Sequence, residues 1–166
     1  MRRLLTLVLM VLAFAAAKAQ YTVYVFLGES CPICQYHTLT LNTLSAEYAG
    51  KGVTVVGLFP NPDSDSATID SFRREYQLTF ELRKDIGRQY MNRLGATITP
   101  QVFVVNETTG IVHYKGRIDD KYTTLGKRKT TPAVPDLKNA LDALLAGKTA
   151  PVTETTAVGC YIDSEY

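Results

Sequence analysis

The sequence has no tryptophan, only two histidines and only three cysteines among its 166 residues. A structural zinc site commonly uses two cysteine pairs, but this chain has one pair, Cys31 and Cys34, and a single further thiol, Cys160. A c-type haem attachment requires the pattern C-x-x-C-H, and Gln35 stands where the histidine would be. The shortage of ligands therefore disfavours a zinc site, and the missing histidine excludes covalently attached haem.

Long apolar runs are also scarce, apart from one at the N-terminus. Two arginines precede an apolar stretch over residues 4–17, and Ala17-Lys18-Ala19 has the A-x-A pattern of a signal cleavage site. The stretch is shorter than the roughly 20 residues of a membrane span, and no cysteine stands at the cleavage point to carry a lipid. We therefore expect residues 1–19 to be an export signal, cleaved near Ala19, and the mature chain to be periplasmic or secreted without a stable membrane anchor.

The chain lacks a strong charge of either sign. Its formal net charge is +2, and removal of Arg2, Arg3 and Lys18 with the signal changes this to −1, since 2 − 3 = −1. The basic excess thus belongs to the export signal, and nothing favours nucleic acid as a partner. Export also places the cysteines in an oxidising compartment, where a dithiol stays reduced only if a redox partner supplies electrons.

The stretch with the clearest chemistry is GESCPIC at residues 28–34, between an apolar run at residues 21–27 and a segment of helical periodicity. Cys31 falls where the helix N-cap is expected, and the positive end of the helix dipole there favours a thiolate and lowers its pKa. Pro32 suits the first helical position. The pattern predicts a redox dithiol, with Cys31 as nucleophile and Cys34 as resolving thiol. A structural disulfide is the alternative, although so short a loop removes little chain entropy.

The rest of the chain predicts one α/β domain over residues 20–147, followed by a tail over residues 148–166. Strands are expected at the apolar or alternating runs of residues 21–27, 53–59, 97–105 and 111–115. Helices are expected over residues 33–48, from 64–66 to 76, 86–94 and 135–147. Residues 80–85 are ambiguous between strand and loop, and residues 116–133 are expected to form a long surface loop. This order predicts a central mixed β-sheet flanked by helices.

Several of these motifs resemble the thioredoxin-like redoxin and peroxiredoxin-like proteins of the AhpC/TSA group. The matching parts are CPIC at residues 31–34, GATITPQVFV at 95–104, GIVHYKG at 110–116 and VGCYI at 158–162, the last similar to a subgroup with a C-terminal Gly-Cys tail. The resemblance implies a thioredoxin-like fold without a cofactor, and a cis Pro100 that faces the dithiol. It also implies that the Thr99 backbone binds an extended substrate segment along its edge. For Pro100, an ordinary trans proline at a strand entry is the alternative.

The sequence departs from two relatives of this group. Peroxiredoxins carry Pro-x-x-x-Thr/Ser-x-x-Cys, and neither Cys31 nor Cys34 has the required residues before it; Ser30 replaces the tryptophan that precedes the first cysteine of thioredoxin. We therefore expect a thiol-disulfide oxidoreductase that acts on protein or small-molecule disulfides and thiols, with a weak thiol peroxidase as an alternative. The Pro-Ile dipeptide does not determine the direction of electron flow.

Two residues near the dithiol are candidates for auxiliary roles. Glu29 is a candidate base or modulator of the thiolate pKa, although a loop carboxylate is commonly solvated. His37 lies one turn after Cys34, and two thiolates with one imidazole suit Cu(I). A Cu(I)-binding, chaperone-like module that uses Cys31, Cys34 and His37 is therefore a further alternative, although the cysteine spacing does not match copper chaperones of the Sco type. A buried histidine without a ligand role is the simpler interpretation.

The third candidate is Cys160, in the tail. Residues 157–162 are apolar within an otherwise polar tail, which favours docking on the domain. An extended tail after residue 147 is long enough to cross a domain of this size. We expect Cys160 to lie near the dithiol as an auxiliary resolving thiol or a third soft ligand. A free or intermolecularly paired tail cysteine is the alternative.

Overall fold

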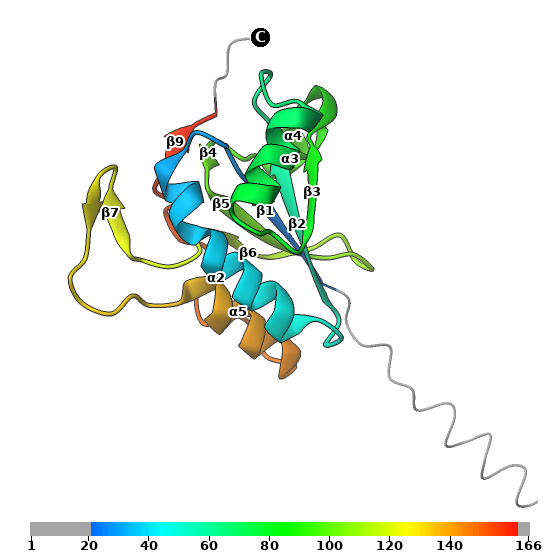
Figure 1. Cartoon of the computed structure of the whole chain (residues 1–166). Coiled ribbons are helices and arrows are strands. Elements are labelled where there is room, and N and C mark those ends of the chain that lie inside the picture. The colour runs from blue at the N-terminus through cyan, green and yellow to red at the C-terminus, as the bar shows by residue number, and fades with distance from the viewer. Residues whose placement is uncertain (1–20, 163–166) are drawn as a thin grey trace, which may run out of the picture.

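The computed structural model describes residues 21–162, so the expected export signal at residues 1–19 lies outside the described residues (Figure 1). A five-stranded mixed sheet in the order β3-β2-β1-β5-β6 forms its centre. The strands are β1 (Tyr21–Phe26), β2 (Val53–Phe59), β3 (Glu81–Lys84), β5 (Gln101–Asn106) and β6 (Val112–Gly116). β1, β2 and β3 run parallel, and β5 and β6 continue the sheet with antiparallel pairing. The ambiguous residues 80–85 therefore contain a strand.

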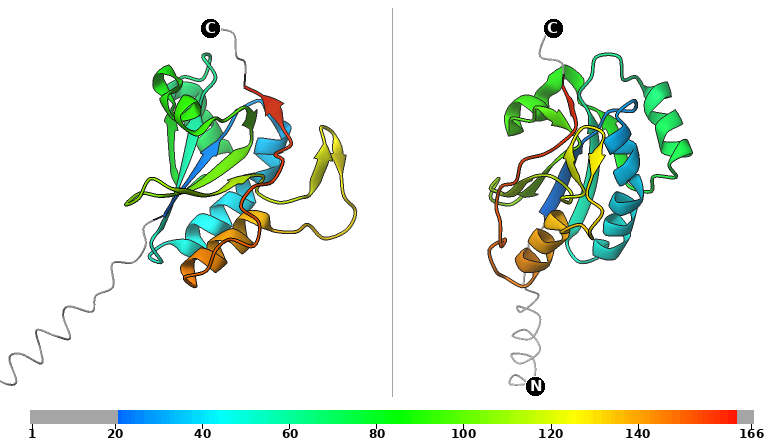
Figure 2. Two further views of the ribbon diagram at one scale, coloured as in Figure 1. Left: turned by 180° about the vertical axis from the view of Figure 1, so that it is seen from behind. Right: turned by 90° about the vertical axis from the view of Figure 1, so that its left-hand side faces the viewer.

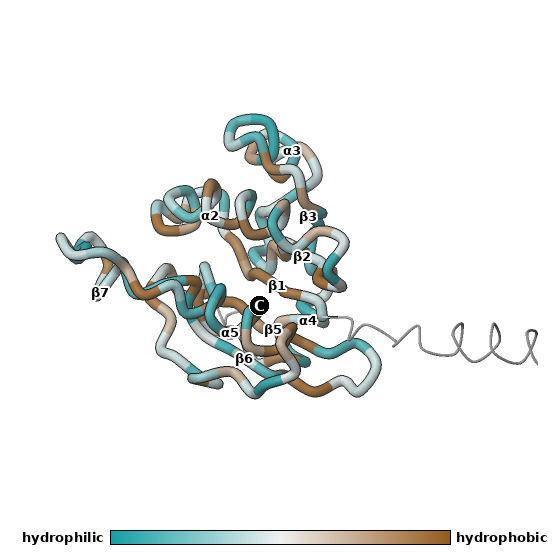
Figure 3. Tube along the Cα trace, turned by 90° about the horizontal axis from the view of Figure 1, so that it is seen from below, coloured by the Kyte–Doolittle hydropathy of each residue, from teal (hydrophilic) through white to brown (hydrophobic). Residues whose placement is uncertain are grey.

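Helices cover both faces of this sheet (Figures 1 and 2). They are α2 (Pro32–Tyr48), α3 (Ser66–Glu75), α4 (Gln89–Leu94) and α5 (Asp136–Leu145), with a short 3-10 turn, η1 (Ile86–Arg88), before α4. Apolar side chains of α2, α3 and α5 pack with Val23 and Val25 of β1, whereas α4 packs with Tyr24 and Phe26 on the opposite face. Because both faces are covered, every residue of β1 is buried. In Figure 3 the central strands are accordingly mostly brown, and α3 is mostly teal.

The expected strand over residues 97–105 is divided into two. A cis peptide bond between Thr99 and Pro100 separates β4 (Ile98–Thr99) from β5. β4 leaves the main sheet and pairs with a strand from the tail. Pro100 thus lies between the two strands and belongs to neither.

The expected long surface loop over residues 116–133 has local structure that was not predicted. This segment contains a hairpin made of β7 (Tyr122–Thr124) and β8 (Lys127–Arg128), which projects from the body of the molecule (Figure 1). The Arg128 guanidinium lies over the rings of Tyr36 and Tyr122, 5.3 and 5.6 Å from their centroids. The hairpin is therefore attached to α2 by contacts between residues far apart in the sequence.

The tail is packed against the domain. Figure 2 shows it running from α5 back along the sheet to β9 (Cys160–Tyr161), beside β4. On the way, Lys115 N–H donates to Thr153 O and Thr155 N–H donates to Lys115 O, both at 3.0 Å, so the tail follows β6. A Cβ at Gly116 would lie 2.2 Å from Thr155 Oγ1. The absence of a side chain at Gly116 is what allows the tail to come this close.

Candidate active site

Cys31 is the N-cap of α2, at the end of the loop that follows β1. Its N–H donates to Gly28 O at 3.1 Å, its carbonyl accepts from Gln35 N–H at 3.0 Å, and Pro32 occupies the first helical position. The rigid proline and these two hydrogen bonds hold the cysteine at the positive end of the helix. Only 2% of Cys31 is exposed, so the thiol is almost fully covered.

Three free thiols meet at this position. The Cys160 thiol donates to Cys31 Sγ at 3.0 Å, and the Gly28 N–H donates to Cys34 Sγ at 3.4 Å. The Cys31 thiol in turn donates to the carbonyl oxygen of Thr99 at 3.2 Å. The structure thus brings Cys31, Cys34 and Cys160 together with the residue before the cis proline.

Hydrogen bonding and burial give these three thiols different pKa values. Hydrogen bonding from Cys34 and then from Cys160 lowers the pKa of Cys31 to about 5. Burial, and then hydrogen bonding to Cys31, raises the pKa of Cys34 well above its ordinary value; the same causes raise the pKa of Cys160 to about 11. Cys31 is therefore the most acidic of the three thiols and the one that ionises first.

The backbone edge at Thr99, implied as a substrate-binding surface, is covered by the tail. Thr99 pairs with Cys160 and Ile98 pairs with Tyr161 in antiparallel register. The Thr99 hydroxyl also donates to Cys160 O at 3.3 Å. The polypeptide found on this edge is thus a segment of the same chain, with its cysteine against the nucleophile.

Glu29 lies beside the dithiol, but its carboxylate is hydrogen-bonded elsewhere. Ser64 Oγ donates to Glu29 Oε2 at 2.8 Å and Thr68 Oγ1 donates to Glu29 Oε1 at 3.2 Å. Both partners lie at the start of α3, whose N-cap is Asp65. The contacts of Glu29 therefore join the active-site loop to α3.

His37 is buried on α2, with Nδ1 3.7 Å from Asp119 Oδ2. Burial lowers the pKa of His37, although the negative charge of Asp119 opposes the shift. Its ring packs edge-on against Tyr36 and Tyr122. Within residues 21–162 no group of three or more His, Cys, Asp or Glu side chains is arranged to hold a metal ion. The alternative of a Cu(I) site made of Cys31, Cys34 and His37 therefore finds no support among these residues.

Residues 11–115 match the family model described as the AhpC/TSA family. The chain belongs to the AhpC/TSA family. Similar solved structures include a hypothetical protein from Sinorhizobium meliloti 1021 (25% identity, TM-score 0.76, covering 87% of this chain and 80% of that chain). An uncharacterized conserved protein from Geobacillus kaustophilus is also similar (24% identity, TM-score 0.76, covering 89% of this chain and 78% of that chain). The comparison with curated proteins finds none that matches.

A third similar structure is the thioredoxin domain of a thiol-disulfide oxidoreductase from Bacteroides vulgatus (17% identity, TM-score 0.57, covering 77% of this chain and 81% of that chain). The fold of this AhpC/TSA family member is thus thioredoxin-like, as predicted. Membership of a subgroup with a Gly-Cys tail stays a prediction.

Two glycines of this AhpC/TSA chain contribute to the site in ways that their motifs, GESCPIC and VGCYI, do not indicate by themselves. Gly28 supplies the N–H that bonds Cys34 Sγ, and a Cβ there would lie 3.3 Å from Thr99 Oγ1. A Cβ at Gly159 would lie 2.0 Å from Thr99 O. The sequence shows them only as Gly28 at the start of GESCPIC and Gly159 directly before Cys160.

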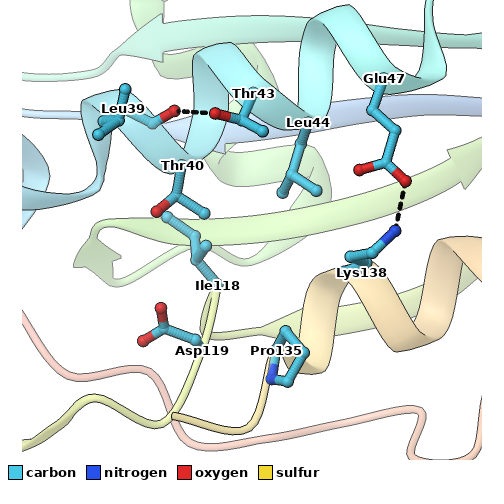
Figure 4. Close-up of a pocket in the computed structure, with 9 residues that line it drawn as sticks. All are labelled: Leu39, Thr40, Thr43, Leu44, Glu47, Ile118, Asp119, Pro135 and Lys138. Atoms are coloured by element: carbon cyan, nitrogen blue, oxygen red, sulfur yellow. Dashed lines mark hydrogen bonds and ion pairs between the residues drawn. The ribbon is translucent and has the colours of Figure 1, made fainter. Parts of the chain in front are cut away.

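Two surface hollows flank this region of the AhpC/TSA chain. One, of about 340 Å³, adjoins the active-site loop and is lined by Glu29, Ser30, Asn61, Pro62, Asp63, Ser64 and Thr68. The other, of about 310 Å³, lies between α2 and α5 and includes Leu39, Ile118 and Lys138 (Figure 4). No cysteine lines either hollow, and only the first is lined by residues of the active-site loop.

Proposed function

We propose that this protein is an exported thiol-disulfide oxidoreductase whose nucleophile is Cys31. The observation that supports the proposal is that the pKa values of Cys31 and Cys34, both at the N-terminus of α2, are shifted in opposite directions. The pKa of Cys31 is lowered to about 5, whereas that of Cys34 is raised well above its ordinary value. A cysteine with a low pKa is a ready nucleophile and a good leaving group. The neighbouring protonated thiol, Cys34, is then available to resolve the mixed disulfide.

In the reducing direction, the Cys31 thiolate attacks one sulfur of a substrate disulfide. The substrate S–S bond breaks, the first substrate thiolate leaves and takes a proton from solvent, and a mixed disulfide with Cys31 forms. Cys34 then loses its proton and attacks Cys31 Sγ, which expels the second substrate thiol. The substrate gains two electrons, and the enzyme ends as the Cys31–Cys34 disulfide. The oxidising direction is the reverse, and the reduction potential of the couple decides between them.

The substrates we propose are protein or small-molecule disulfides, positioned at the edge of Thr99 and cis Pro100. The name of the Bacteroides vulgatus neighbour, a thiol-disulfide oxidoreductase, is consistent with this chemistry. The signal-like residues 1–19 support export to the periplasm or beyond, where a separate redox partner exchanges electrons with the dithiol. No helix within residues 21–162 is long and apolar enough to cross a membrane.

Insulin reduction in the presence of dithiothreitol tests the proposal. We expect the wild-type chain to accelerate precipitation of the insulin B chain, Cys31→Ser to lose this activity, and Cys34→Ser to accumulate a mixed disulfide visible by mass spectrometry. Exposed Thr43, which is hydrogen-bonded on α2, supplies a control as Thr43→Ala. Equal activity of Cys31→Ser and wild type would overturn the mechanism. Peroxide consumption with a thiol reductant present, measured in a separate assay, tests the peroxidase alternative.

A further inference from the structure

The C-terminal segment, residues 157–162, occupies the edge where the proposed function requires a substrate polypeptide. We infer that this edge is a binding site selective for extended segments of the pattern Gly-Cys-any-aliphatic, and that the chain's own tail fills it as an internal copy of such a substrate. The inference rests on the proposed function and goes beyond it by naming the substrate class. Three independent contacts of the tail, described next, define the pattern.

The first contact is a steric filter at the residue before the cysteine. A Cβ on Gly159 would lie 2.0 Å from Thr99 O, 2.6 Å from Thr99 C and 3.1 Å from Pro100 Cδ. Gly159 does not have a positive φ, so the requirement for glycine comes from space and not from backbone conformation. The obstructing atoms belong to the backbone and the proline ring, which cannot move aside as a flexible side chain can. Any residue larger than glycine is therefore excluded from this position.

The second contact selects an aliphatic side chain two positions after the cysteine. Ile162 is 5% exposed and packs with Tyr24, Phe26 and Phe103 on the α4 face of the sheet. Its N–H donates to Thr97 O at 3.0 Å, which extends the pairing of β9 beyond Tyr161. Tyr161, between Cys160 and Ile162, is 78% exposed, so the site does not select the side chain at that position. Burial of an aliphatic side chain and a continued backbone ladder together favour the pattern.

The third contact is chemical. Cys160 Sγ lies 3.0 Å from Cys31 Sγ, in the place of a substrate sulfur under attack. For an external peptide whose cysteine carries a leaving thiol, the Cys31 thiolate attacks the peptide sulfur and the leaving thiol departs. Cys34 then attacks Cys31 Sγ, and its proton passes to the released peptide thiolate. The peptide disulfide is reduced and the enzyme is oxidised to the Cys31–Cys34 disulfide, by two electrons in each case.

An external segment must displace the tail, because both use the same backbone edge. The tail is anchored upstream at Thr155, whose Oγ1 accepts the Arg117 N–H at 3.0 Å and lies 2.8 Å from Tyr114 Oη. Residues 157–162 can therefore lift from β4 while Thr155 keeps them close by. Because the tail is tethered close to β4, its effective concentration at this edge is high. The state in which the edge is free for an external segment is therefore the minor one.

Synthetic peptides copying residues 155–162, each with its cysteine as a pyridyl mixed disulfide, test the pattern on the mature chain. Release of thiopyridone by the pre-reduced chain in a single turnover gives a second-order rate constant. We expect the copy with valine in place of the glycine, and the copy with aspartate in place of the isoleucine, to react roughly tenfold more slowly or worse. The copy with serine in place of the tyrosine is the matched control, expected within about twofold of the parent peptide.

Gly159→Ala in the chain tests the competition, because its Cβ would expel the tail from β4. We expect the second-order rate constant for the parent peptide to rise several-fold over wild type, with the same order of preference among peptides. Circular dichroism and the reaction of Cys31 with dithiodipyridine, a small disulfide, check that the variant is folded and competent. Ile162→Asp is a second variant with the same expected effect.

The two proposals fail differently. Failure of dithiodipyridine to oxidise Cys31 would overturn the proposed function. Normal reaction with dithiodipyridine, together with equal rates for all four peptides on wild type and on Gly159→Ala, would overturn the substrate pattern alone. A preference among peptides without a rise in the variant would overturn the role of the tail as a competitor.

Discussion

Replacement of Cys160 by alanine should raise the pKa of Cys31. The Cys160 thiol donates to Cys31 Sγ at 3.0 Å, and this bond favours the thiolate. A hydrogen bond to a charged group contributes about 1.5 to 3 kcal/mol, and one pKa unit corresponds to about 1.4 kcal/mol. Because a thiol is a weak donor, we take the lower end of this range. The pKa of Cys31 should therefore rise from about 5 by roughly 1 unit.

The assay follows the ultraviolet absorbance of the thiolate, or the rate of alkylation by iodoacetamide, as a function of pH. Reactivity of Cys31 should fall as the pH drops through its pKa, and in Cys160→Ala this fall should begin at a higher pH. Cys160→Ser is the matched control, since its hydroxyl can still donate and should keep most of the shift. Cys34→Ala should raise the pKa further than Cys160→Ala, because Cys34 is the larger cause.

The reasoning would be refuted if Cys160→Ala titrated like wild type, because the bond between the two sulfurs would then not stabilise the thiolate. It would also be refuted if Cys160→Ala and Cys160→Ser shifted the pKa equally. Equal shifts would mean that loss of packing, and not loss of a donor, had altered the site. Thermal denaturation of both variants separates these effects from a change in fold.

Two further predictions concern the neighbours of the dithiol. Glu29→Ala removes the acceptor of Ser64 and Thr68 and should lower the free energy of unfolding, measured by urea denaturation, by about 1 to 2 kcal/mol. Glu29→Gln keeps one acceptor and should lose less stability. An unchanged urea midpoint in Glu29→Ala would contradict this role of Glu29. Burial lowers the pKa of His37 below its unfolded value of about 6.5, so the unfolded state binds more protons and stability falls as the pH drops below about 6.5. His37→Phe should weaken this fall between about pH 7.5 and 5.5, and equal falls in both proteins would count against it.

Much of the fold and part of the site follow from local patterns in the sequence. The apolar runs at 21–27 and 53–59 predict strands covered on both faces, and β1 and β2 lie there. The placement of Cys31 at a helix N-cap follows from a strand, a short turn and Pro32, all within a few residues. Such features are predictable because neighbouring residues determine them.

The features that could not be predicted depend on contacts across the chain. The hairpin at β7 and β8 is held by Arg128 over rings that include one on α2, and no periodicity in residues 116–133 indicates it. The partners of Glu29 lie 35 and 39 residues away, so the sequence shows only a loop carboxylate. The apolar end of the tail indicated docking, but the pairing of Cys160 with Thr99 is a two-residue ladder without a pattern of its own.

The path of the tail along β6 also bears on aggregation. A sheet edge with free N–H and C=O groups is a template for another chain, and here Thr153 and Thr155 take up the backbone groups of Lys115 on one edge. The other edge is β3, which is four residues long, three of them charged (Glu81, Arg83 and Lys84). Short charged edges resist pairing between molecules. A chain cut after α5 would thus lose both the segment on the active site and the cover of β6, and its self-association would obscure the effect on catalysis. Point substitutions such as Gly159→Ala keep that cover in place.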